Sequence, residues 1–135
     1  MKKYFIFTVV TLGLALALAA CGGSGPSTSL KVDMTEFMFD PDVYTIPAGE
    51  TITLELSNNG AIKHEFVIMN FGTEVGAEFG DEDEANIFWE AELEPGESGT
   101  FTFIAPSEPG GYQIVCGTEG HYVAGMVGSL TVVAE

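Results

Sequence analysis

The eleven residues from Cys116 to Met126 constrain the fold of this chain more than any other segment, because they place a thiol, an imidazole and a thioether close together. Four residues separate Cys116 from His121, and four separate His121 from Met126. Glycines between them allow the tight turns that would direct all three side chains to one point. His64, the only other histidine, begins an apolar run after an Asn-Gly turn. We therefore expect a loop between two strands that meets a neighbouring strand at one end of a β-sandwich.

Two histidines, one cysteine and a weak axial methionine form the ligand set of blue-copper sites. The soft thiolate and thioether suit Cu(I), and imidazoles suit both oxidation states. The chain has two histidines and two cysteines, and Cys21 directly follows an N-terminal leader, which gives it a separate role. The sequence therefore predicts one type 1 copper, cycling between Cu(I) and Cu(II). Its expected ligands are His64, Cys116, His121 and Met126.

Each of these residues has an ordinary structural alternative when it is considered alone. A single histidine at a strand end is more often a surface or hydrogen-bonded residue than a ligand. Cys116 alone would be read as a small buried hydrophobic residue, and Met126 as part of the core. The joint spacing, and the use of every available histidine, favour the copper interpretation.

Residues 1–20 have the pattern of a secretory signal, with Lys2 and Lys3 before an uncharged apolar stretch. The ending Leu18-Ala19-Ala20-Cys21 resembles the lipobox of bacterial lipoproteins, which implies cleavage before Cys21 and lipidation of its thiol. An uncleaved membrane anchor is the alternative, although the apolar stretch is slightly short for one. Both interpretations predict an extracytoplasmic domain tethered to a membrane, periplasmic or on the outer cell face.

Residues 21–29 are rich in glycine, serine and proline and are expected to be a flexible tether, followed by one domain over residues 30–135. Within the domain, apolar and polar residues alternate over 51–57, with Ile52, Leu54 and Leu56 predicted to face inward. Several such short strands separated by turns predict an all-β antiparallel sandwich. The acidic segment 70–94 is long for a loop and has room for a short helix near 82–89.

The formal net charge of −16 excludes nucleic acid as a partner, because phosphate binding needs a basic surface. Removal of the leader would take away two lysines and no acidic residue, so the domain would be still more acidic. Solubility is the simplest explanation of this charge. Steering toward a cationic redox partner is the functional one.

With these motifs together, the chain resembles the cupredoxins, the small blue copper proteins. The resemblance covers nearly all of residues 30–135 and is most specific from Gly111 to Val132, where the Cys–His and His–Met gaps are closest to those of auracyanin. It implies a Greek-key β-sandwich of seven or eight strands, with His64, Cys116 and His121 as equatorial ligands and Met126 as the axial one. It also implies a monomeric electron carrier that docks redox proteins transiently through an apolar patch near His121, including residues 122–124.

The chain departs from many relatives at two positions. Glu65 follows the first ligand histidine, where asparagine is common, and Gly117 follows the cysteine in place of a bulkier residue. An anionic neighbour would favour Cu(II). We expect no enzymatic activity, because four protein ligands leave no open position for a substrate. Copper delivery or storage is the alternative function, and a metal-free structural sandwich is a third.

Overall fold

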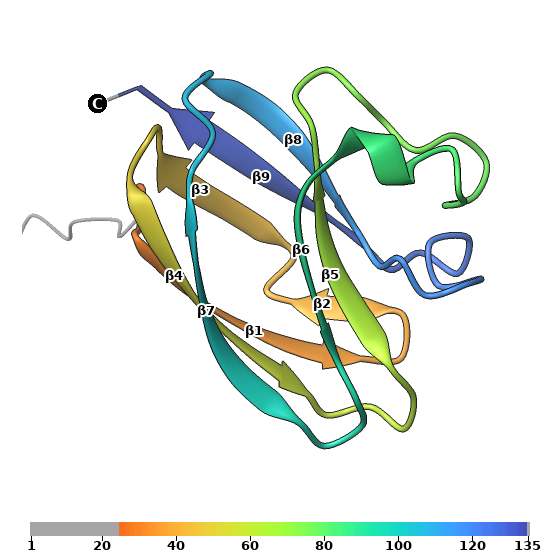
Figure 1. Cartoon of the computed structure of the whole chain (residues 1–135). Helices are drawn as coiled ribbons and strands as arrows, with labels where there is room; N and C mark the ends of the chain where they lie inside the picture. The colour runs from red at the N-terminus through yellow and green to blue at the C-terminus, as the bar shows by residue number, and fades with distance from the viewer. Residues whose placement is uncertain (1–24, 135) are drawn as a thin grey trace, which may run out of the picture.

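The computed structural model describes residues 25–134, which form two β-sheets that pack face to face (Figure 1). One sheet has the strand order β2-β1-β4-β7, and the other has the order β3-β9-β8-β5-β6. The strands are β1 (Ser29–Thr35), β2 (Met38–Asp40), β3 (Val43–Pro47), β4 (Thr51–Asn58), β5 (His64–Met69), β6 (Ile87–Leu93), β7 (Ser98–Ile104), β8 (Gly110–Val115) and β9 (Val127–Val133). A short 3₁₀ helix, η1 (Glu84–Asn86), precedes β6.

The core lies between the two sheets and follows the alternation of the strands. Ile52, Leu54 and Leu56 of β4 are almost fully buried, which confirms their predicted inward orientation. They belong to one apolar cluster with Phe66 and Ile68 of β5, in the opposite sheet. Burial of alternate residues on both sheets is what makes the sandwich stable, since each sheet covers the apolar face of the other.

The predicted all-β sandwich is confirmed, with two differences in detail. The described residues form nine strands rather than seven or eight, because β2 adds a three-residue edge strand. The expectation of a purely antiparallel arrangement was wrong, since β1 pairs with β4, and β3 with β9, in parallel. Alternation has the same period in both kinds of pairing, so the sequence pattern does not reveal strand direction.

The acidic segment 70–94 contains an edge strand that the sequence reading missed. In β6, Ala91 and Leu93 point into the core, while Glu90 and Glu92 are exposed. Charged side chains on an edge strand discourage pairing with other chains, but they also weaken the strand signal in the sequence. The expected short helix is the single turn η1, just before this strand.

At the start of the described residues, β1 begins at Ser29, and the Ser27 N–H donates to the Thr45 carbonyl at 2.9 Å. Residues 1–24 and 135 lie outside the described part of the chain, and the predicted signal, Cys21 and residues 22–24 of the predicted tether lie there. Between residues 25 and 134, no helix has the length and apolar character needed to span a membrane.

Candidate metal centre

His64 is placed by the sheet and by a hydrogen-bonded loop that leads into it. It is the first residue of β5 and lies opposite Leu93 of β6 in the antiparallel ladder. The buried Asn58 side chain holds the preceding loop, because its amide nitrogen donates to the carbonyls of Ile62 and Leu93, both at 2.9 Å. Its amide oxygen accepts from the Gly60 N–H at 2.9 Å. The backbone that delivers His64 is thus fixed on both sides.

The second part of the site is the loop from Cys116 to Met126, which joins β8 to β9. The Cys116 N–H donates to the Met126 carbonyl at 3.1 Å, and the Met126 N–H donates to the His121 carbonyl at 3.0 Å. The His121 N–H in turn donates to the Thr118 carbonyl at 3.0 Å. Gly125 has a φ of 99°, a conformation that residues with a Cβ rarely adopt, and it allows the final turn before Met126.

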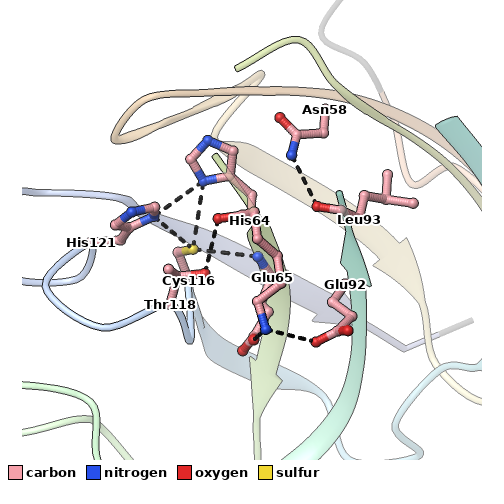
Figure 2. Close-up of polar contacts among 9 residues, drawn as sticks. Asn58, His64, Glu65, Glu92, Leu93, Cys116, Thr118 and His121 are labelled. Atoms are coloured by element: carbon pink, nitrogen blue, oxygen red, sulfur yellow. Dashed lines mark hydrogen bonds and ion pairs between the residues drawn. The ribbon is translucent and has the colours of Figure 1, made fainter. Parts of the chain in front are cut away.

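The structure brings three of the four predicted ligands to a common point (Figure 2). The Nδ1 atoms of His64 and His121 are 3.1 Å apart. The Cys116 Sγ lies 3.4 Å from the His121 Nδ1 and 3.9 Å from the His64 Nδ1. His64 and Cys116 are fully buried, and His121 is 4% exposed. The distances are those of donor atoms that surround a single small site.

Met126 also belongs to this end of the core. Its side chain is fully buried in the same apolar cluster as Cys116. Its backbone is hydrogen-bonded to both Cys116 and His121, so its position is set by the same loop that carries them. A thioether in this place is compatible with a weak fourth donor.

Burial determines the charge state of the two histidines. Desolvation lowers the pKa of His64, and the adjacent His121 lowers it further. Desolvation also lowers the pKa of His121. Both imidazoles are therefore held neutral, which is the form that binds a metal. The facing Nδ1 atoms can share only one proton, whereas a cation can accept both of their lone pairs together with the thiolate. The donor set fits one copper ion, because two imidazoles and one thiolate beside a weak thioether donor are the ligand set of blue-copper sites.

Glu65 lies beside this loop, at the position where the sequence departs from many relatives. Its N–H donates to the Cys116 Sγ at 3.4 Å, and its carboxylate pairs with Lys63 at 3.1 Å. A Cβ built on Gly117 would lie only 2.2 Å from the Glu65 Oε2. The two departures are therefore one steric pair, in which the missing side chain at 117 leaves space for the carboxylate at 65.

Several residues that support the predicted ligands were not predicted from the sequence. Thr118 ties the two ligand segments together, since its hydroxyl donates to the Lys63 carbonyl at 3.1 Å. Asn58 directly precedes the Asn59-Gly60 turn at the end of an alternating strand, and this position was the signal available in the sequence. Phe37, which contacts the His121 ring edge-on at 5.2 Å between ring centres, had no distinguishing sequence signal.

The model of the cupredoxin-like domain matches residues 8–132, which is most of the chain. The chain belongs to the cupredoxin-like family. Among curated relatives of this cupredoxin, auracyanin-A of Chloroflexus aurantiacus is 31% identical over an alignment that covers 89% of the chain and 91% of the relative. Auracyanin-B of the same organism is 32% identical, with 86% of the chain covered. The alignment spans only 59% of the length of auracyanin-B.

Solved structures agree with this assignment. Dithionite-reduced auracyanin from Roseiflexus castenholzii superposes with a TM-score of 0.69 at 33% identity, covering 81% of this cupredoxin and 99% of that protein. Auracyanin A of Chloroflexus aurantiacus, described as a blue copper protein, has a TM-score of 0.60 at 28% identity. The copper prediction, made from donor types and spacing, is confirmed by the family and by the donor cluster.

Proposed function

We propose that this cupredoxin transfers single electrons through one type 1 copper held by His64, Cys116, His121 and Met126. The observation that carries the proposal is the buried cluster of two Nδ1 atoms and one thiol sulfur. Copper supplies the redox couple when it is bound. The chain supplies two neutral imidazoles and a cysteine at the end of a strand, in an arrangement fixed by backbone hydrogen bonds. All four donors come from the protein, so we expect no catalysis.

Electrons would enter and leave beside His121, the one ligand of the cluster that retains some exposure. Apolar side chains surround this end of the molecule. Val123 is 64% exposed, Phe37 45% and Ile62 44%. An apolar contact without strong anchors suits a transient complex, in which a small interface allows rapid release. The sequence suggested an apolar patch over residues 122–124. Val123 and Ala124 are exposed, whereas Tyr122 is half-buried and its hydroxyl donates a hydrogen bond to the Val75 carbonyl.

The strong negative charge supports a cationic redox protein as the partner. The cupredoxin would bind this partner as a monomer. Long-range attraction between opposite charges raises association rates and falls with added salt. Association with a basic electron carrier is therefore expected to slow as ionic strength increases. Equal association rates at low and high salt would mean that the acidic surface serves only solubility.

The proposal also places the domain outside the cytoplasm, held to a membrane by a lipid on Cys21. Support comes from the leader over residues 1–20 and the small residues before Cys21. Mass spectrometry of the protein purified from bacterial membranes would show a diacylglyceryl group on an N-terminal Cys21. A Cys21→Ser variant that remains fully membrane-bound would favour an uncleaved anchor instead.

The test of electron transfer is a Cu(II) titration of the purified protein, followed by visible absorption. We expect one equivalent to produce an intense thiolate-to-copper band that ascorbate bleaches and an oxidant restores. Rapid, reversible reduction by a redox protein would complete the assignment. A pale band, or one that does not respond to ascorbate, would contradict the proposal.

Copper delivery or storage is the second candidate, and one comparison favours it. The copper-resistant cuproprotein CopI of Rubrivivax gelatinosus is 30% identical over 77% of this chain. A delivery protein must release its metal, so transfer of copper to an equimolar acceptor protein within minutes would support this role. Retention of copper during many redox cycles would support electron transfer.

A further inference from the structure

Glu36 and Phe37 form the two-residue turn between β1 and β2. This turn contacts His121 directly and also contacts the loop that leads to His64. Thr35 pairs with Met38 across the hairpin, which leaves Glu36 and Phe37 as its tip. Phe37 has a φ of 65° and is the only non-glycine with a positive φ among residues 25–134. Bulky side chains rarely adopt this conformation, and such strain persists only where the surrounding structure imposes it.

Core packing does not explain why phenylalanine occupies this strained position. The Phe37 side chain is 45% exposed, so much of its apolar surface remains in water. Glycine would adopt the same backbone conformation at little cost. What the ring does provide is an edge-on contact with His121, at 5.2 Å between ring centres and 89° between ring planes. His121, which the ring contacts, is carried by a loop rather than by a strand.

Glu36 acts on the other histidine. Its carboxylate accepts a hydrogen bond from the Ala61 N–H, in the loop that leads to His64. A Cβ on Gly60 would lie 2.7 Å from the Glu36 Oε1 and 2.8 Å from the His64 Nε2, so glycine lets both atoms approach this position. The His64 Nε2 is buried and has no hydrogen-bond partner among the described residues. It points away from the Cys116 sulfur (Figure 2). The negative charge of the Glu36 carboxylate, which lies on that side of the ring, favours the tautomer with the proton on Nε2 and a free lone pair on Nδ1.

We propose that the Glu36–Phe37 turn is a positioning element for the copper site, with Phe37 fixing the ring plane of His121 and Glu36 fixing the loop and the tautomer of His64. The turn belongs to neither ligand segment, yet it bridges both of them. This inference rests on the copper site of the proposed function. Neither residue provides a donor atom, so the expected effect is on how firmly and in what geometry copper is held.

Two Phe37 variants of the full chain separate the ring from the backbone. Phe37→Gly and Phe37→Ala both remove the ring, but only glycine adopts a φ of 65° freely, so apo Phe37→Gly should have the higher Tm. Loss of Cu(I) to excess bathocuproine disulfonate should be about tenfold faster than wild type in both variants, as for other residues that support metal ligands. Their Cu(II) EPR hyperfine splitting should shift equally. Phe37→Tyr, which keeps the ring, should restore wild-type behaviour.

The outcome identifies which idea fails. A wild-type protein that forms no thiolate-to-copper band would refute the copper site itself. A blue wild-type protein whose Phe37→Gly and Phe37→Ala variants match it in copper loss and EPR would overturn only the positioning role. Copper loss that follows apo Tm, slower in Phe37→Gly than in Phe37→Ala, would also overturn it, since the ring would then act through fold stability.

Glu36 has its own matched pair. Glu36→Gln keeps an oxygen that can accept from the Ala61 N–H, whereas Glu36→Ala removes it. We expect Glu36→Ala to accelerate copper loss about tenfold and Glu36→Gln to do so less. In the diamagnetic Cu(I) protein, ¹⁵N NMR should report the His64 Nε2–H tautomer, with altered shifts in Glu36→Ala. An Ala variant identical to wild type in both measurements would exclude Glu36 from the positioning element.

Discussion

The two histidines that are predicted to bind copper are held in different ways. His64 begins a strand, and its backbone is part of a ladder with Leu93 on an element far along the chain. His121 lies in a loop whose ends are hydrogen-bonded to each other, through Cys116 and Met126. The position of His64 depends on pairing between distant strands, whereas the position of His121 depends on hydrogen bonds within its own loop. Substitutions on the β5 side should therefore lower the stability of the whole domain. Substitutions in the loop should mainly change how copper is bound.

The largest expected effect comes from removing the thiol on the loop side. Cys116→Ala should abolish the thiolate-to-copper absorption completely, because no other thiol lies in the described domain. The apo domain should still fold, with a small loss in the free energy of unfolding from the lost sulfur contacts. Visible absorption and urea unfolding measure the two effects. A variant that remains blue would show that the band has another origin.

The next effect tests the β5 side. Asn58→Ala removes two donated hydrogen bonds and one accepted bond at a site that is 1% exposed. The substitution leaves the Ile62 and Leu93 carbonyls and the Gly60 N–H without these bonds. A buried polar group without a partner costs about 1–3 kcal/mol, so the free energy of unfolding should fall by about 2–4 kcal/mol in total. Urea unfolding of the apo protein measures this. Asn58→Asp, which keeps only the acceptor, is the control, and a loss below about 0.5 kcal/mol would refute the role of Asn58.

A double-mutant cycle tests whether the two regions are coupled at Glu65 and Gly117. Gly117→Ala should destabilise the domain by less than about 1 kcal/mol, because its Cβ meets only the flexible end of the Glu65 side chain, which would have to shift within its ion pair with Lys63. In a Glu65→Ala background that cost should disappear, which gives a coupling free energy of about 0.5 kcal/mol. Urea unfolding of the four proteins supplies the cycle. Additive effects would mean that the carboxylate simply moves aside.

The sequence predicted the loop side better than the strand side, for a physical reason. Cys116, His121 and Met126 lie within one short segment, so their convergence needs only local turns. The inward face of β4 was also predictable from alternation. Other features depend on contacts between distant segments. These are the direction of β1 and β3, the strand β6 with its exposed Glu90 and Glu92, and the contact of Phe37 with His121. A single sequence carries no local signal for such contacts.

A smaller effect should appear in the pH dependence of the apo protein. Burial lowers the pKa of both His64 and His121 below their ordinary value of 6.5. As the pH falls below 6.5, the unfolded chain takes up protons that the folded protein does not, so stability decreases until the lower folded pKa values are reached. Urea unfolding between about pH 5 and 7 should show this slope. Replacing His121 with glutamine should reduce it, and an unchanged slope would assign it to other groups.

The smallest expected change is Met126→Leu, which distinguishes packing from ligation within the loop. Leucine nearly conserves volume at this fully buried site, so the free energy of unfolding should change by less than about 1.5 kcal/mol. The copper should remain, since the two imidazoles and the thiolate are retained. Loss of the thioether donor and its replacement by a hydrocarbon should disfavour the more highly charged Cu(II), so the reduction potential should rise. Voltammetry of the two proteins measures this. An unchanged potential with an intact blue band would mean that Met126 serves the core alone, and that the loop carries only two of the ligands.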